Sequence, residues 1–266
     1  MKKILFLTNK DNGYFEEEDS VLIDFLGHYF ELVVSHPQDC LSLLQKVEGI
    51  IIRNIWPTHE YAENWSEVER KIKDSGLRVY NSLSGKGDVN GKDYLLKLFQ
   101  DGYPIIPSVD RLVDISKLET AEYYWIKPKD GCDGYGSGKY TKDELTDKDL
   151  NNYIIQPYVE FTSEPSLFFI DNIYSHGITM RNRLNDTCIG EYMPSAKEIA
   201  LAERFVKWND LPRGIQRIDF VQTKNGSLLL TEIEDLCPYL YLDDVIIETR
   251  NKFLEDIRVS VVNYFR

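Results

Sequence analysis

Short apolar runs alternate with amphipathic stretches over the first ninety residues. The runs are rich in β-branched residues and lack strict polar alternation, which is typical of strands buried on both faces. They are Ile4–Thr8, Leu32–Ser35, Gly49–Arg53 and Arg78–Asn81. Helical periodicity between them predicts helices around Val21–Tyr29, Leu41–Val47 and Ala62–Lys73. Because strands that alternate with helices form βαβ units, this pattern predicts a small parallel sheet.

The pattern changes after the polar, glycine-rich loop Ser82–Gly91, and we place a domain boundary near Ser84. The first elements expected beyond it are a helix at Lys92–Gln100, strands at Tyr123–Lys127 and Tyr153–Gln156, and a short helix within Lys142–Leu150. The two strands flank a loop with four glycines, so the chain here is predicted to double back on itself.

Hairpin signals dominate the rest of the chain. Asp171-Asn172 and Lys224-Asn-Gly226 are turn sequences between apolar runs. The strands that they join are Ser166–Ile170 with Ile173–Ile178, and Arg217–Gln222 with Ser227–Glu234. A helix is predicted at Ser195–Trp208, where Ser195 and Glu198 have the spacing of a capping box. The predicted fold is therefore a parallel α/β section followed by an antiparallel α+β section.

Composition narrows the class of protein. The 266 residues carry 31 lysines and arginines against 44 aspartates and glutamates, and the net charge of −13 argues against a nucleic-acid partner. The cysteines are far apart and have no metal-ligand spacing, so they are interpreted as reduced thiols; they are Cys40, Cys132, Cys188 and Cys237. No apolar run approaches the roughly 18 residues of a membrane span, and the N-terminus turns polar too soon for a signal peptide. We expect a cytoplasmic protein without a membrane partner.

The stretch Trp125–Lys139 has four glycines and three lysines. It lacks the GxxxxGK[ST] sequence of a Walker loop and the GxGxxG sequence that opens a helix. Extended residues follow Gly138, which favours a flap between two strands. Glycines let backbone N–H groups approach anionic oxygens, and Lys127 would add an ammonium group beside them. A surface hairpin explains this loop equally well when the loop is considered alone.

The last predicted hairpin carries the more specific signal. Asp219 lies on one strand and Glu232 and Glu234 on the next, at alternating positions that share a face. Carboxylates so close would repel one another unless a cation lay among them. Oxygen ligands of this kind suit Mg²⁺. A solvated acidic hairpin does not explain why these carboxylates interrupt apolar residues such as Ile218 and Ile233, so we predict a metal site.

Taken together, these motifs resemble an ATP-grasp domain, of the kind found in D-alanine:D-alanine ligase and glutathione synthetase. The order and spacing match from about Lys92 to Leu242. The matching residues are Lys92; Lys127-Pro128 with Gly131, Gly134, Gly136 and Gly138; Gln156-Pro-Tyr-Val159; Glu164-Pro-Ser-Leu167; Ser175-His176 through Arg181; and Arg217-Ile-Asp219 with Glu232-Ile-Glu234. The resemblance implies a pre-ATP-grasp domain at 1–84 and a two-lobed ATP-grasp domain divided into 85–158 and 159–266.

The resemblance also implies a role for each matching residue. Lys92, Lys127 and Arg181 would contact the ATP phosphates beneath the flap of Gly131, Gly134, Gly136 and Gly138, with Arg183 as a substitute for Arg181. The hinge Gln156, Pro157, Tyr158 and Val159 would hold adenine, and Glu164 the ribose. Asp219, Glu232 and Glu234 would hold one or two Mg²⁺ ions, although many family members have Asn where this chain has Glu234. Arg217 would stabilise the oxyanion, so the implied catalytic residues are Arg217, Lys127 and Arg181.

The implied chemistry is the joining of a carboxylate and an amine through an acyl phosphate, with release of ADP and phosphate. No protein nucleophile is needed, so Cys132 in the flap is interpreted as a tolerated small residue. Two alternatives stay open at this point. A phosphotransferase acting on a hydroxyl would share every ATP residue, and a regulatory nucleotide-binding module would need no substrate at all.

The substrates are predicted only as a class. Small, amino-acid-like carboxylates and amines suit the compact N-terminal section, and a homodimer is compatible with the sequence. Candidate substrate contacts are Arg53, Trp56 and the short polar segment Arg183–Ser195, while a surface arginine and a packing tryptophan are equally good interpretations of the first two. The acidic run Glu16–Asp19 is interpreted as a solvated helix start, with a ligand role as the alternative.

Overall fold

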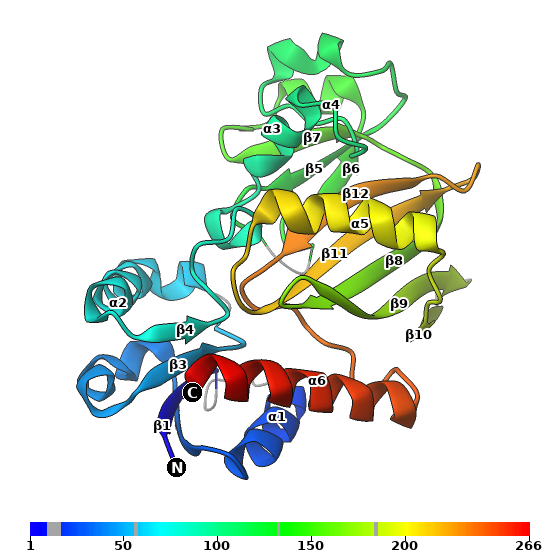
Figure 1. Ribbon diagram of the computed structural model, residues 1–266. Coiled ribbons are helices and arrows are strands. Elements are labelled where there is room, and N and C mark those ends of the chain that lie inside the picture. The colour runs from blue at the N-terminus through cyan, green and yellow to red at the C-terminus, as the bar shows by residue number, and fades with distance from the viewer. Residues whose placement is uncertain (10–16, 56–57, 132–133, 184–185) are drawn as a thin grey trace.

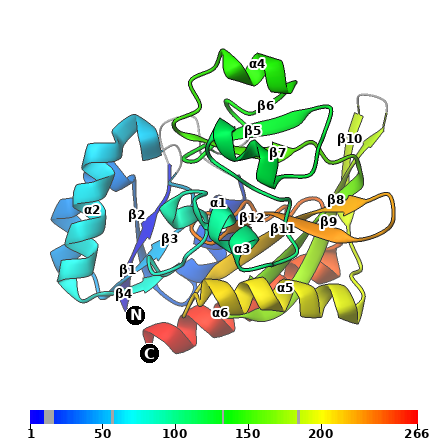
Figure 2. The ribbon, with the colours of Figure 1, turned by 90° about the horizontal axis from the view of Figure 1, so that it is seen from above.

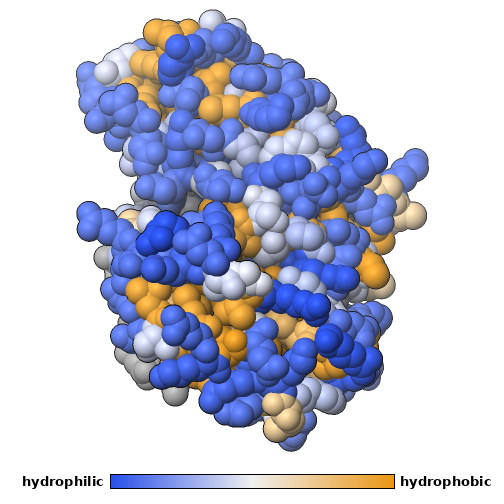
Figure 3. Space-filling view, turned by 60° about the vertical axis from the view of Figure 1, so that its left-hand side comes forward, coloured by the Kyte–Doolittle hydropathy of each residue, from blue (hydrophilic) through white to orange (hydrophobic). Residues whose placement is uncertain are grey.

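The computed structural model describes residues 1–9, 17–55, 58–131, 134–183 and 186–266, without the side chains of 59–60, 181–183 and 186–187. In these residues the strands form three sheets, one parallel and two antiparallel (Figures 1 and 2). The fold class expected from the sequence is therefore confirmed. No helix in the described ranges is both long and apolar enough to span a membrane. On the face shown in Figure 3, hydrophilic residues cover most of the surface.

The N-terminal sheet is parallel, with the strand order β2-β1-β3-β4. Its strands are β1 (Lys3–Leu7), β2 (Glu31–Ser35), β3 (Gly49–Ile52) and β4 (Arg78–Tyr80), and its helices are α1 (Glu17–Gly27) and α2 (Ala62–Ser75). The helix predicted around Leu41–Val47 is present as the 3₁₀ helix η2 (Leu41–Lys46) rather than as an α-helix. The segment is a short connector, for which 3₁₀ geometry is common.

The small sheet, with the order β6-β5-β7, lies apart from the N-terminal sheet at the top of Figure 1. Its strands are β5 (Tyr124–Pro128), β6 (Gly138–Tyr140) and β7 (Tyr153–Pro157), and α4 (Lys142–Thr146) follows β6 in the chain. Helix α3 (Tyr94–Gln100) instead packs with α5 (Ala196–Asn209) in the core of the large sheet. Antiparallel pairing of β5 with β6 confirms that the glycine loop joins two strands. The short 3₁₀ helices elsewhere are η1 (Pro37–Asp39), η3 (Thr58–Tyr61), η4 (Asp88–Asn90) and η5 (Leu112–Lys117).

The large antiparallel sheet has the order β10-β9-β8-β11-β12. Its strands are β8 (Phe161–Ile170), β9 (Ile173–Arg183), β10 (Asp186–Glu191), β11 (Ile215–Thr223) and β12 (Leu228–Glu234). Both predicted hairpins are confirmed. The segment Arg183–Ser195, expected to be a short polar connection, contains β10, which pairs with β9 along the edge of the sheet.

Two helices cover opposite faces of the large sheet. Helix α5 (Ala196–Asn209) packs on the face that carries Leu167 and Ile218, and it begins at the predicted capping box of Ser195. Helix α6 (Ile247–Phe265), which the sequence analysis does not predict, packs on the face of Phe168. The same core includes residues of β1 and α1, so α6 lies between the N-terminal sheet and the large sheet (Figure 1).

A buried ion-pair cluster connects the N-terminal sheet to the loop after β12. Arg53 is 2% exposed and donates to Glu18 at 2.8 Å, to Asp19 at 3.0 Å and to the Pro238 carbonyl at 3.1 Å. Both carboxylate oxygens of Glu18 accept from the Leu240 N–H at 2.9 Å. The interpretations of Arg53 as a surface residue and of the acidic run as solvated are therefore wrong for Arg53, Glu18 and Asp19, because Arg53 pairs with both carboxylates inside the protein.

The substitution Arg53→Met is expected to lower the free energy of unfolding by about 3–5 kcal/mol, because it leaves two buried carboxylates without their cation. Denaturant unfolding measures this change. The matched control is Arg70→Met, since Arg70 pairs with Asp74 at 3.2 Å on the exposed face of α2 and such pairs contribute little. Equal losses of unfolding free energy in the two variants would contradict the stabilising role assigned to the buried ion-pair cluster.

His176 on β9 is held as a neutral ring in the core. It is 4% exposed, stacks on Phe168 with ring centroids 4.4 Å apart and meets Phe253 edge-on at 5.6 Å. Its Nε2 atom has no hydrogen-bond partner among the described residues. Burial lowers the pKa of His176 from 6.5 to about 4. Protonation of this ring therefore opposes folding.

Between these two pKa values the unfolded chain binds a proton at His176 that the native chain does not, so stability falls as the pH falls. His176 contributes at most about 1.4 kcal/mol per pH unit to the slope of the free energy of unfolding against pH. The variant His176→Phe keeps an aromatic ring against Phe168 but cannot titrate. As the pH is lowered across this range, the free energy of unfolding of His176→Phe is expected to fall less steeply than that of the wild type. Equal slopes for the two proteins would refute the buried, neutral state assigned to His176.

Candidate active site

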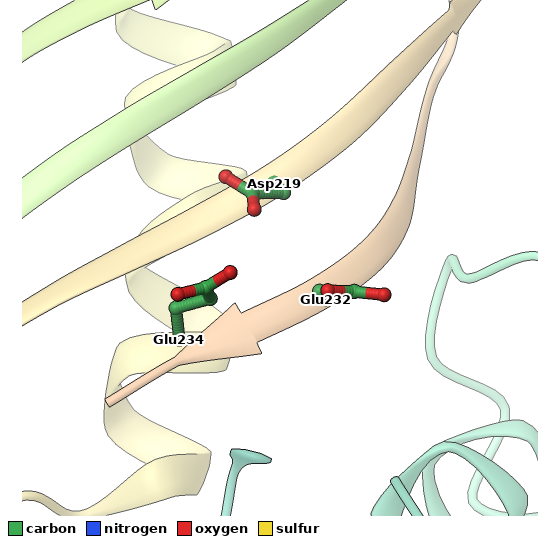
Figure 4. Close-up of side chains that lie close together, drawn as sticks. All are labelled: Asp219, Glu232 and Glu234. Carbon is green, nitrogen blue, oxygen red and sulfur yellow. The ribbon is translucent and has the colours of Figure 1, made fainter. Parts of the chain in front are cut away.

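Four charged side chains share one face of the β11–β12 hairpin. Arg217 lies opposite Glu234 and Asp219 lies opposite Glu232 in the strand register, and Figure 4 shows the three carboxylates together on the two neighbouring strands. The next pair joins Phe220 to Leu230, so β12 has one extra residue, Thr231, at a β-bulge.

The bulge at Thr231 decides which way the glutamates point. Leu230 is buried in the core under α5, and strict alternation would turn Glu232 and Glu234 toward that core as well. The extra residue reverses the alternation, so that Ile233 continues the buried face and both glutamates lie beside Asp219. The sequence predicted the shared face of the carboxylates correctly but not the bulge that creates it.

The three carboxylates form a compact oxygen cluster. One oxygen from each of Asp219, Glu232 and Glu234 lies within 4.8 Å of the others, and all three residues are half-buried. Because the donor set is oxygen only and carries three formal negative charges, it fits a hard divalent cation such as Mg²⁺. This arrangement agrees with the ligand set predicted from the sequence, and its role in metal binding stays a proposal.

Basic side chains offset the negative charge of the carboxylate cluster. Arg217 donates to Asp219 at 2.9 Å, to Glu234 at 2.8 Å and to the Tyr239 carbonyl at 3.1 Å. Lys127 on β5 donates to Glu232 at 3.2 Å and to the Thr231 carbonyl of the bulge at 2.9 Å.

Lys92, which precedes α3, reaches the cluster from another side. Its Nζ lies 3.4 Å from Glu232 and also pairs with Asp88. Residues far apart in the chain therefore place three cations around three carboxylates.

The pKa values reflect this balance of burial and charge. Burial opposes ionisation of Glu232, but Lys127 and Lys92 outweigh it and hold its pKa well below the usual range. Burial raises the pKa of Glu234 to about 8, and Asp219 adds to this shift although Arg217 counteracts it. Burial also opposes the charge on Lys92, but Asp88 and Glu232 raise its pKa overall. One glutamate is thus firmly ionised and the other resists ionisation.

A cavity of about 620 Å³ opens in front of the cluster, between the small sheet and the large sheet. The predicted site residues that line it are Lys92, Lys127, Gly131, Gly134, Gln156, Pro157, Tyr158, Val159, Glu164, Arg217, Asp219, Glu232 and Glu234. Burial, with the Asp219 charge second, raises the pKa of Glu164. The fold therefore brings together at one cavity residues that span more than 140 positions of the chain.

The other predicted residues either do not line this cavity or lie partly or wholly outside the described structure. Gly136, with a φ of +73°, and Gly138, which begins β6, belong to the flap but do not line the cavity. Arg181 and Arg183 have their backbone in β9, whereas their side chains lie outside the described part of the structure. Cys132 and Trp56 lie wholly outside the described residues.

A second cavity of about 530 Å³ adjoins the first and shares Lys92, Gly131, Arg217, Glu234 and Tyr241 with it. Its other walls come from the N-terminal sheet and from the loop after β12, including Arg53, Trp65 and Tyr239. The sequence analysis missed Tyr239 and Tyr241, as well as Trp125 in the first cavity. Trp125 faces the cavity from the register position opposite Gln156, so strand alternation around Lys127 could have identified it.

No protein-family model matches the sequence, and no curated protein matches it either. Solved structures do match. D-cycloserine synthetase DcsG has a TM-score of 0.77 at 19% identity, covering 97% of this chain and 99% of its own. ATP-grasp ligase PsnB, complexed with a phosphomimetic variant of a minimal precursor, Mg and ADP, has a TM-score of 0.69 at 12% identity, covering 99% and 98%. D-alanine–D-alanine ligase from Bacillus anthracis, complexed with ATP, has a TM-score of 0.69 at 15% identity, covering 100% and 99%.

These likenesses extend over nearly the whole chain. The protein therefore has the ATP-grasp fold, as its sequence motifs implied. The expected domain bounds 1–84, 85–158 and 159–266 stay a prediction.

Millimolar Mg²⁺ is expected to raise the temperature of unfolding, because a cation that binds only the native carboxylate cluster stabilises the native state. Asp219→Asn keeps the shape of the side chain but removes one charge, and it is expected to lose most of this increase. The control is Asp256→Asn, an exposed carboxylate on α6 that pairs with Lys252. Thermal unfolding with and without Mg²⁺ measures the effect, and an undiminished increase in Asp219→Asn would exclude a metal site here.

Proposed function

We propose that the protein is an ATP-dependent carboxylate–amine ligase that forms an amide through an acyl phosphate, using ATP and Mg²⁺. The observation that carries this proposal is the Asp219, Glu232 and Glu234 cluster, with Lys92 and Lys127 beside it, at one end of the cavity lined by the glycine flap. Oxygen ligands and two ammonium groups at one cavity suit a magnesium nucleotide. The ligase structures with the same fold support the choice of reaction.

Each group of residues has its own role in the proposed reaction. The hinge Gln156–Val159 receives the adenine, and Glu164 accepts hydrogen bonds from the ribose hydroxyls. Asp219, Glu232 and Glu234 would hold Mg²⁺, which would supply positive charge to offset that of the phosphates. Lys92 and Lys127 hold the phosphates in position. Arg181, from β9, is proposed to contact the γ-phosphate.

Binding would exchange partners around the carboxylates. Glu232 now pairs with Lys92 and Lys127, and Arg217 now bridges Asp219 and Glu234. With the carboxylates engaged by a metal ion, the ammonium groups of Lys92 and Lys127 would be available to phosphate oxygens. Arg217 becomes available to the oxyanion that forms when the amine attacks the acyl phosphate. The same groups that compensate one another in the free protein therefore supply the charges that the reaction needs.

The second cavity is the proposed compartment for the carboxylate and the amine. It adjoins the first at Arg217 and is lined by both acidic and basic side chains, including Glu18, Asp88 and Lys129. Its volume of about 530 Å³ and its mixed charge suit small zwitterions. We infer that the substrates are amino-acid-like. Among the similar structures, D-alanine–D-alanine ligase has amino-acid substrates by name, whereas PsnB is complexed with a peptide precursor.

The test is ADP release by the purified protein with ATP, Mg²⁺ and pools of amino acids, followed by mass analysis of the products. The expected product has the summed mass of the two substrates less one water, and one ADP and one phosphate form per amide. A product heavier than one substrate by one phosphoryl group would instead identify a phosphotransferase. ADP release that no pool stimulates would refute the proposed amino-acid-like substrates.

Asp219→Asn and Glu232→Gln are expected to abolish turnover while weakening nucleotide binding only moderately, since the lysines and the hinge remain. Full activity in either variant would contradict the metal assignment. Glu255→Gln, on the exposed face of α6, serves as the control and is expected to keep wild-type turnover.

A further inference from the structure

Asp235 is a buried carboxylate that directly follows the proposed metal ligand Glu234. It borders the second cavity, but it is 0% exposed. One of its carboxylate oxygens accepts from the Gly87 N–H at 2.9 Å, and the other accepts from the Val89 N–H at 2.9 Å. Asp235 therefore ties the end of β12 to the segment that precedes α3.

The two backbone groups that Asp235 binds lie on either side of Asp88. The Asp88 carboxylate pairs with Lys92 Nζ, which also lies 3.4 Å from Glu232. Because Asp235 holds both neighbours of Asp88, it restricts where the Asp88 side chain can point. A chain of contacts thus runs from Asp235 through Asp88 to the Lys92 ammonium group at the carboxylate cluster.

The segment before α3 has glycines where it approaches Asp235. A Cβ atom on Gly87 would lie 2.5 Å from the Ile233 carbonyl oxygen and 3.0 Å from Asp235 Oδ2, and a Cβ atom on Gly85 would lie 2.1 Å from the same Oδ2. The lack of a Cβ atom at both positions lets the backbone reach the carboxylate. An asparagine in place of Asp235 would set its NH₂ group against one of the two N–H donors, so this contact needs a carboxylate.

The backbone of this segment has other anchors as well. Asn209 of α5 shares the Gly87 N–H with Asp235, at 3.0 Å. The Lys92 N–H donates to the Lys129 carbonyl at 2.8 Å, which fixes the Lys92 backbone beside the end of β5. The main chain of Lys92 is thus placed without Asp235, and the distinct contribution of Asp235 is to direct the lysine side chain.

We propose that Asp235 is a positioning residue that keeps the Lys92 ammonium group in place for the nucleotide phosphates. A lysine side chain that is already held beside the carboxylate cluster loses little conformational freedom when phosphate binds, so its contribution to affinity is larger. The end of β12 then carries both a proposed metal ligand, Glu234, and the anchor of a proposed phosphate contact. The proposal rests on the proposed function, to which it adds a residue that acts only through others.

The experiment is calorimetry with ADP in the presence of Mg²⁺, since ADP carries phosphates but is not turned over. Lys92→Met is expected to weaken ADP binding roughly 10- to 100-fold, the range for one charge-assisted hydrogen bond. Asp235→Asn is expected to weaken it roughly 5- to 20-fold, because the lysine remains but is less well held. When both substitutions are combined, the affinity is expected to match that of Lys92→Met alone, since two changes that act through one group are not additive.

Gly87→Ala tests the same contact from the other side. It leaves the Asp235 carboxylate intact but brings a Cβ atom against the Ile233 carbonyl, so ADP binding is expected to weaken at least several-fold. The matched control is Asp171→Asn, because Asp171 also accepts from a backbone N–H, that of Gly214 at 3.2 Å, and lines neither cavity. Its affinity for ADP is expected to match that of the wild type.

The outcomes separate this inference from the function on which it rests. If the wild type does not bind ADP, the proposed function fails as well. Wild-type affinity in Asp235→Asn overturns the inference alone. So does an equal fold loss for Asp235→Asn with and without Lys92→Met, because Asp235 would then not act through the lysine, and so does an equal loss in the Asp171→Asn control. Circular dichroism establishes which variants are folded, and Gly87→Ala decides by the same criterion if Asp235→Asn is not.

Discussion

Charge compensation around Asp219, Glu232 and Glu234 is the interaction on which the rest of the site depends. Three carboxylates within 4.8 Å repel one another in a half-buried setting, and the structure offsets this with Arg217, Lys92 and Lys127. These cations come from three different segments. The need to neutralise the cluster therefore holds the large sheet, the small sheet and the segment before α3 together at one point.

The same charges support the proposed phosphate chemistry. The carboxylates partly offset the cost of burying the cations, and under the proposed function a metal ion held by the carboxylates would free these cations for phosphate oxygens. The bulge at Thr231 supports this arrangement twice, because it turns Glu232 toward Asp219 and leaves the Thr231 carbonyl to accept from Lys127. One extra residue in the backbone of β12 therefore determines which charged groups lie together at the cavity.

The N-terminal sheet contributes to the site through buried charged residues that hold the loop after β12. Arg53 and Glu18 bind the backbone of Pro238 and Leu240, and the Tyr239 carbonyl between them accepts from Arg217. Helix α6 fills the space between the N-terminal sheet and the large sheet with a shared apolar core. The proposed substrate cavity lies where these parts meet, so its shape depends on packing that is remote from the carboxylates.

The sequence by itself determined both sheet types, most of the elements and the residues proposed for the site. Apolar periodicity and turn residues identified the sheets, and the spacing of Glu232 and Glu234 placed these two side chains on one face because strand alternation is a local property. Tertiary structure alone decided the rest. Whether Arg53 and Glu18 are solvated or paired, and where α6 packs, depend on contacts between residues distant in the chain, which no local pattern encodes.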